Sequence, residues 1–249
     1  MIKKHIPNLI TLLNLLCGGF AILTAFSGYL VMAAYFIGLA ALLDFLDGFA
    51  ARLFNAYSDF GKQLDTLADL ISFGFAPAVI MYQLLLLSNN VTHYYLAGVS
   101  LPSLVALLIT VFSALRLAKF NIDSRQTNAF IGLPTPANAL FFASLPLVII
   151  QSAHQQGFFS QIIIKALSNY YFLAFLICFM CFLLISELRL FALKFQTYRW
   201  HDNKWRYIFL AGAAISVLLF SYKAIPLIIF FYVLLSLIIG IFDKPHHTN

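Results

Sequence analysis

The sequence predicts an all-α integral membrane protein with about eight transmembrane helices, and two observations support this fold class. The 249 residues are 62% hydrophobic and only 10% charged, with a mean hydropathy of +0.92, whereas a soluble domain is about half apolar and a quarter charged. The apolar runs are long enough to span a bilayer as helices, and they lack the short alternation of a transmembrane β-barrel. We therefore expect one polytopic membrane domain over residues 1–249.

Short polar breaks divide the chain into eight apolar segments. These segments cover residues 8–27, 30–52, 63–87, 94–118, 135–152, 169–189, 207–221 and 225–242. Asn8 and Thr11 are placed to cap the first helix, which we expect to be a retained helix and not a cleaved signal peptide. The cysteines Cys17, Cys178 and Cys181 all fall within apolar segments, where we expect small buried residues and not a metal or redox site.

The basic residues predict the orientation of the chain in the membrane. With the N-terminus in the cytoplasm and eight spans, thirteen of the fifteen Lys and Arg residues lie on the cytoplasmic side, and only Lys165 and Lys223 lie outside. Cytoplasmic loops normally carry this excess of positive charge. We therefore expect a protein of the cell (inner) membrane, with both termini and the active site on the cytoplasmic side. The net charge of +6 favours contact with anionic lipid headgroups over nucleic acid.

Four aspartates at the ends of two consecutive apolar segments are the main functional signal. Asp44 and Asp47 are three residues apart, and Asp65 and Asp69 are four apart, so each pair shares one face of a helix. Residues 53–60 are polar enough to form a reversing loop, which would bring the four carboxyl groups together. Carboxylates within an apolar helix are costly and usually functional. Hard oxygen ligands of this kind suit Mg²⁺, Mn²⁺ or Ca²⁺, and two adjacent ions could hold a diphosphate.

The residues around the aspartates fit a bulky, negatively charged ligand. Gly48 and Ala51 remove side-chain bulk from the same face as the first pair, and Gly61 does so before the second pair. Arg52 offers a planar guanidinium group for phosphate. An ordinary helix-pairing role, such as Asp44 with Arg52, accounts poorly for four acids and one arginine. The pattern indicates a site for a metal-bound nucleotide diphosphate at the membrane surface.

The spacing of these residues resembles the signature of the CDP-alcohol phosphotransferase family. At every defined position the chain matches Asp44-x-x-Asp47-Gly48-x-x-Ala51-Arg52, then eight residues, then Gly61-x-x-x-Asp65-x-x-x-Asp69. Four further stretches resemble the phosphatidylserine synthase branch: residues 6–11 (IPNLIT), 69–77 (DLISFGFAP), 114–121 (ALRLAKFN) and 132–137 (GLPTPA). The likeness covers residues 6–140 with specific motifs and the later helices only by general pattern.

The resemblance implies an activity and a set of site residues within the catalytic motif 44–69. Members of that branch join CDP-diacylglycerol and L-serine to give phosphatidylserine and CMP, and relatives are commonly homodimers. By position, Asp44, Asp47, Asp65 and Asp69 would bind two divalent metal ions, Mg²⁺ or Mn²⁺, and Asp69 would also be the general base. The resemblance further implies that the CDP moiety is lined by Gly48, Ala51, Arg52 and Gly61.

The carboxylate of serine would need a cationic partner. Arg116 is our first candidate, with Lys119 or Arg125 assisting and Asn121 adding a hydrogen bond. Arg116 and Lys119 are three residues apart, hence on one helix face, although both could instead anchor the helix end at the membrane surface by snorkelling.

Three other functions stay open. The protein could be another member of the family with a different acceptor, such as a phosphatidylglycerophosphate or phosphatidylinositol synthase. An ion-coupled transporter is a distant alternative that lacks the expected internal repeat, and a non-catalytic lipid-binding scaffold is a third.

Overall fold

The computed structural model describes residues 5–122, 130–155, 157–190 and 200–242. Its helices are α1 (Ile6–Phe26), α2 (Leu30–Leu53), α3 (Asp59–Asp69), the π-helix η2 (Leu70–Phe75), α4 (Ala76–Leu86), the 3₁₀ helix η3 (Pro102–Leu107), α5 (Leu108–Ile122), α6 (Thr135–His154), α7 (Phe158–Leu167), α8 (Tyr170–Ile185), α9 (Trp200–Phe220), the 3₁₀ helix η4 (Ser221–Lys223) and α10 (Ala224–Phe242). Two antiparallel pairs of two-residue strands complete it, β1 (Tyr95–Leu96) with β2 (Val99–Ser100) and β3 (Phe130–Ile131) with β4 (Arg189–Leu190).

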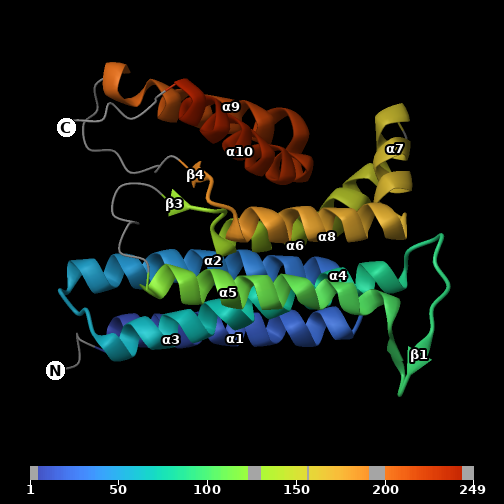
Figure 1. The fold of residues 1–249 in the computed structure, drawn as a ribbon, viewed down its shortest axis with the longest axis horizontal. Coiled ribbons are helices and arrows are strands. Elements are labelled where there is room, and N and C mark those ends of the chain that lie inside the picture. Colours follow the sequence, from blue (N-terminus) through green and yellow to red (C-terminus); the bar gives the residue numbers. More distant parts are fainter. Residues whose placement is uncertain (1–4, 123–129, 156, 191–199, 243–249) are drawn as a thin grey trace.

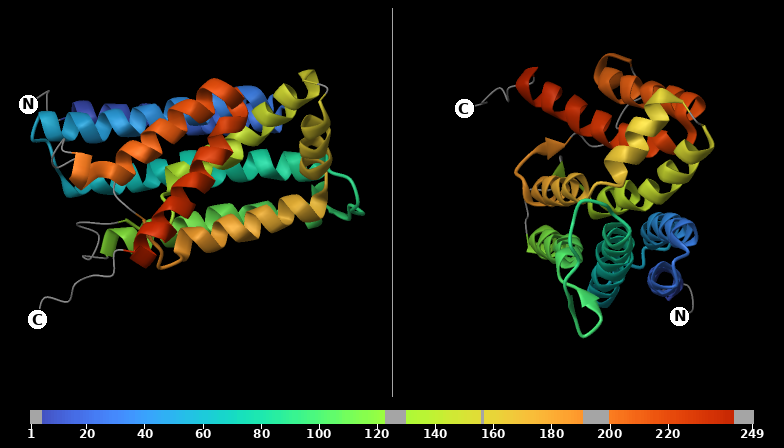
Figure 2. Two further views of the ribbon diagram at one scale, coloured as in Figure 1. Left: turned by 90° about the horizontal axis from the view of Figure 1, so that it is seen from above. Right: turned by 90° about the vertical axis from the view of Figure 1, so that its right-hand side faces the viewer.

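The helices form a multi-pass membrane bundle, as expected. In the described residues, six stretches are long and apolar enough to cross a membrane, and the last of them, Asn203–Ile239, includes both α9 and α10. The shorter apolar helices α7 and α8 complete the set. Figure 1 shows α1 to α5 running along the long axis, with α6 and α8 above them and α9 and α10 in a further layer. Figure 2 shows α10 crossing the other helices obliquely and packing on α6.

The most extensive helix packing, between α1 and α2, involves small residues. Ala21 and Ala25 of α1 and Ala33 and Ala40 of α2 are fully buried. Small side chains let helix backbones approach one another inside a membrane, where apolar burial alone gives no net attraction. The packing of α1 against α2 brings Asp47 beside Thr11 of α1.

The third span changes its helix type directly after Asp69. The six residues of η2 are π-helical and continue without a break into α4. A π-turn leaves carbonyl groups outside the regular hydrogen-bond ladder, and the Thr110 hydroxyl donates to the carbonyl oxygen of Gly74 at 3.3 Å. On another side, the Ser72 hydroxyl donates to the carbonyl oxygen of Asn14 at 3.0 Å. These two bonds tie η2 to α5 and α1.

The structure corrects three expectations about the elements. The fourth apolar segment does not begin as a helix at residue 94, because residues 95–100 form a hairpin around Ala97 and Gly98, which both have positive φ. Helix α7 occupies a stretch that we expected to be loop. Neither Asn8 nor Thr11 caps α1, since the helix starts after His5 without a side-chain cap.

Candidate active site

All four aspartates of the motif lie at one end of the bundle. Asp44 and Asp47 lie near the end of α2, whereas Asp65 and Asp69 lie on α3. The reversing loop expected between them is Phe54–Ser58, in which Asn55 has a φ of 48°. The Ser58 hydroxyl then accepts a hydrogen bond from the Gly61 amide and caps α3. The short loop makes α2 and α3 antiparallel, as the sequence predicts.

The carboxyl groups converge. One oxygen from each of Asp44, Asp47 and Asp65 lies within 4.8 Å of the other two. Asp69 is close enough for its charge to interact with all three. Within the residues that the structure describes, Lys119 pairs with Glu187 at 3.8 Å and not with an aspartate of this cluster.

The cluster has the features of a divalent cation site. In the described part of the chain, Oδ1 of Asp65 and Oδ1 of Asp69 are buried and accept no hydrogen bond. Buried carboxylate oxygens without a donor are rare and costly. Several carboxylates facing one another repel unless a cation lies between them, and oxygen-only ligand sets suit hard divalent ions. The residues present therefore fit a divalent metal ion.

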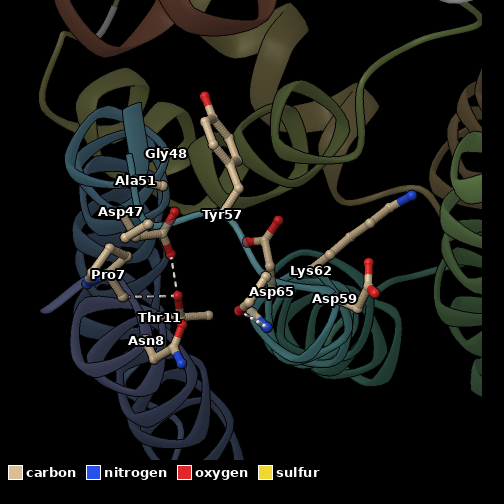
Figure 3. Close-up of a pocket in the computed structure, with 13 residues that line it drawn as sticks. Pro7, Asn8, Thr11, Asp47, Gly48, Ala51, Tyr57, Asp59, Lys62 and Asp65 are labelled. Atoms are coloured by element: carbon tan, nitrogen blue, oxygen red, sulfur yellow. Dashed lines mark hydrogen bonds between the residues drawn. The ribbon is translucent and has the colours of Figure 1, made fainter. Parts of the chain in front are cut away.

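One of these carboxylates is held by the hydroxyl of Thr11, a residue that was not among the predicted site residues. The Thr11 hydroxyl on α1 lies 2.7 Å from Oδ2 of Asp47 and donates to it, and both side chains are buried. Figure 3 shows this contact, with Thr11 below Asp47 and Asp65 on the facing helix. The side chain of Asn14, one turn further along α1, is fully buried next to Asp69. The available signal was the polar series Asn8, Thr11 and Asn14 at three-residue spacing in an otherwise apolar helix.

Two cavities flank the carboxylate cluster. The first, which we call the α1–α3 cavity, has a volume of about 550 Å³. It is lined by the start of α1, the end of α2, the following loop and the start of α3: Pro7, Asn8, Thr11, Asp47, Gly48, Ala51, Ala56, Tyr57, Ser58, Asp59, Gly61, Lys62 and Asp65. Figure 3 shows Gly48 and Ala51 on its α2 wall and Tyr57 above Asp65.

The glycines of the motif act differently in this cavity. A Cβ atom on Gly48 would meet nothing within 4 Å, so its absence leaves room beside Asp47. A Cβ atom on Gly61 would lie 3.0 Å from both Asn8 Oδ1 and Ser58 Oγ, so this glycine lets α3 approach α1. Arg52 is exposed and is not part of the lining; its Nε donates to the carbonyl oxygen of Gly48 at 3.1 Å.

The second cavity, the α3–α5 cavity, has a volume of about 340 Å³. Its lining comprises Asp44, Lys62, Asp65, Thr66, Asp69, Arg116, Leu117, Phe120, Asn121, Pro134, Thr135 and Pro136. The structure thus brings Arg116 and Asn121 to the aspartates. It also adds Lys62 and Thr66, which the sequence reasoning missed, although Lys62 stands three residues before Asp65 on the same helix.

The three basic acceptor candidates do not share one location. Arg116 is 4% exposed, with its guanidinium carbon 5.3 Å from the centre of the Phe120 ring. Lys119 is not part of the lining of the α3–α5 cavity and instead pairs with Glu187. Arg125 lies outside the described residues. The three-residue spacing therefore did not bring Arg116 and Lys119 to the same cavity.

Comparisons with known proteins identify the family of the chain. A sequence profile of the family described as CDP-alcohol phosphatidyltransferase matches residues 4–180. The chain is 40% identical over 147 residues to a CDP-diacylglycerol–serine O-phosphatidyltransferase of Bacillus subtilis (strain 168), an alignment covering 59% of this chain and 75% of that protein.

Two further relatives carry related names. A protein of Helicobacter pylori (strain ATCC 700392 / 26695), with the same name as the Bacillus one, is 38% identical over 136 residues, covering 54% of each chain. An archaetidylserine synthase of Methanothermobacter thermautotrophicus is 36% identical over 159 residues, covering 63% of this chain and 60% of that protein. The chain thus spans little more than half of these two relatives. Because the profile covers most of the chain and includes all four aspartates, the protein belongs to the CDP-alcohol phosphatidyltransferase family.

Proposed function

We propose that this protein transfers the phosphatidyl group of CDP-diacylglycerol to the hydroxyl group of L-serine, giving phosphatidylserine and CMP. The observation that carries the proposal is the meeting of two cavities at one carboxylate cluster. Asp65 lines both cavities, Asp47 faces the first, and Asp44 and Asp69 face the second. Direct displacement at phosphorus needs the incoming and leaving oxygens on opposite sides, and two cavities on either side of one cluster suit that geometry.

The α1–α3 cavity suits the CDP group. Its open wall at Gly48 and Ala51 gives room for a flat base and ribose, and it lies against the carboxylates that would bind the metal-associated diphosphate. The Nε of Arg52 donates to the carbonyl oxygen of Gly48, which lines this cavity, and the Arg52 side chain is exposed. The other N–H groups of its guanidinium would bind phosphate from the edge of the cavity. Gly61 would act by allowing α1 and α3 to close around the ligand.

The aspartates would hold the metal and the transferred proton. Asp44, Asp47, Asp65 and Asp69 would bind two divalent ions, Mg²⁺ or Mn²⁺. When bound, these ions would neutralise charge on the diphosphate. Asp69, which lines the α3–α5 cavity beside Arg116 and Thr135, would accept the proton of the serine hydroxyl. The serine oxygen then forms the new bond to phosphorus, the bond from phosphorus to the CMP oxygen breaks, and its electron pair leaves with CMP.

Serine is favoured over other acceptors by the size and charge of the α3–α5 cavity. Its volume of about 340 Å³ and its basic side chains, Lys62 and Arg116, suit one small carboxylate. A sugar phosphate would need more converging cations. The relatives named above carry serine or archaetidylserine in their names, which supports the same acceptor.

We further propose that the protein lies in the inner membrane as a homodimer, with its active site facing the cytoplasm. The distribution of basic residues supports this orientation.

The test is CMP release by purified protein given CDP-diacylglycerol and either Mg²⁺ or Mn²⁺. L-serine, glycerol 3-phosphate and inositol are supplied separately, and a chelator is added to matched samples. Release with serine that stops on chelation is the expected result. Release with another acceptor would keep the site and change the substrate, and ion flux without CMP release would favour a transporter.

A further inference from the structure

Lys62 stands between the two cavities. It lies on the first turn of α3, three residues before Asp65, and it lines both the α1–α3 cavity and the α3–α5 cavity. Asp65 is shared in the same way. A basic and an acidic side chain on one helix face therefore form the partition between the space suited to the donor and the space suited to the acceptor.

The ammonium group of Lys62 lies on the acceptor side of this partition. Its Nζ donates to the carbonyl oxygen of Asn121 at 3.3 Å, and the Asn121 side-chain amide donates to the hydroxyl of Thr66 at 2.9 Å. Asn121 and Thr66 both line the α3–α5 cavity. Figure 3 shows the Lys62 side chain extending away from Asp47 and Asp65. In the described part of the chain, no carboxylate forms an ion pair with Lys62.

We propose that Lys62 is a specificity-determining residue that binds the carboxylate of the acceptor amino acid together with Arg116. An ammonium group has three N–H donors, and the Asn121 carbonyl takes one, so two are available for an anion. Arg116 is buried on the α5 wall of the same cavity, so the two cations approach from different helices. A carboxylate held between them would leave the acceptor hydroxyl free to face Asp69. This inference rests on the proposed function.

The experiment separates acceptor binding from donor binding. We would measure kcat and KM for L-serine at saturating CDP-diacylglycerol, and for CDP-diacylglycerol at saturating L-serine, with wild type, Lys62→Gln and Lys62→Arg. Lys165→Gln is the matched control, because Lys165 is an exposed lysine on α7 that contributes to neither cavity. Ethanolamine serves as a second acceptor because it keeps the hydroxyl and amine of serine but lacks the carboxylate.

Lys62→Gln should raise the KM for L-serine about tenfold or more, the usual effect of losing a charged hydrogen-bond partner. The KM for CDP-diacylglycerol should stay unchanged. The preference for L-serine over ethanolamine should fall by the same factor, since that preference depends on the carboxylate. Lys62→Arg should recover much of the loss, and Lys165→Gln should behave as wild type.

Three results would overturn the inference while leaving the proposed function intact. These are an unchanged KM for serine, a rise confined to the KM for CDP-diacylglycerol, or a fall in kcat alone with an unchanged preference over ethanolamine. Wild-type protein that releases CMP only with another acceptor would overturn the proposed function, and this inference with it.

Discussion

The hydrogen bond between Thr11 and Asp47 gives a measurable prediction about metal affinity. Thr11→Val keeps the shape of the side chain and removes the hydroxyl that lies 2.7 Å from Asp47 Oδ2. Both residues are less than 7% exposed, and both line the α1–α3 cavity. Hydrogen bonds to charged groups contribute about 1.5–3 kcal/mol, and loss of an outer partner of a metal ligand typically weakens metal binding about 10- to 100-fold.

Two measurements check this expectation. The Mn²⁺ concentration for half-maximal CMP release should rise about 10- to 100-fold in Thr11→Val. Direct Mn²⁺ binding, followed by the electron paramagnetic resonance of the free ion, should weaken by the same factor without any substrate.

Thr24→Val is the matched control for this substitution. Its hydroxyl donates at 2.7 Å to the carbonyl oxygen of Phe20 within the same helix, far from the aspartates. The control should bind Mn²⁺ as wild type does. If Thr11→Val also kept wild-type Mn²⁺ affinity, Thr11 would have no part in holding Asp47, and the reasoning from the 2.7 Å contact would be refuted.

Three further substitutions test other parts of the site and fold. Asp69→Asn should abolish turnover while CDP-diacylglycerol binding stays measurable; loss of both would make Asp69 a metal ligand and not the base. Gly18→Ala should lower the free energy of unfolding by about 1–3 kcal/mol, because the added Cβ would collide with Oγ of Ser72 and lie 2.8 Å from its Cα; thermal unfolding in detergent measures this, and an unchanged midpoint would contradict the close contact of α1 with η2. Lys119→Ala should change stability by about 1 kcal/mol at most, because its pairing with Glu187 is solvent-exposed, and a larger loss in the same assay would show a structural role that the geometry does not predict.

The sequence predicted the carboxylate cluster because local geometry decides it. The three- and four-residue spacings put each aspartate pair on one face, and a short polar loop allows α2 and α3 to lie antiparallel. Contacts between helices that are far apart in the chain could not be predicted from the sequence. Thr11 and Asp47 are 36 residues apart, and nothing in either segment states that α1 packs beside the end of α2. Lys62 was overlooked for the same reason, since its partner Asn121 is 59 residues away.

The acceptor region shows a second limit of prediction from the sequence. Arg116 and Lys119 share an approximate helix face, yet one is buried in the α3–α5 cavity and the other reaches Glu187. Long basic side chains can turn in different directions from neighbouring positions, so spacing alone does not assign them to one ligand. The hairpin at residues 95–100 was missed because its apolar side chains resemble those of a membrane helix, although Ala97 and Gly98 form a turn.

The π-helix after Asp69 lets the third span meet two requirements: the aspartates of α3 must face the carboxylate cluster, and the apolar face of α4 must face the bundle. A π-turn contains one residue more than an α-turn, so the register of α4 is shifted relative to that of α3. Each residue turns an α-helix by about 100°. If the same residues formed a regular α-helix, the extra residue would turn the buried face of α4 by about 100° relative to Asp65 and Asp69. The π-turn absorbs that residue, so the aspartates of α3 can face the carboxylate cluster while α4 presents its apolar face to the bundle.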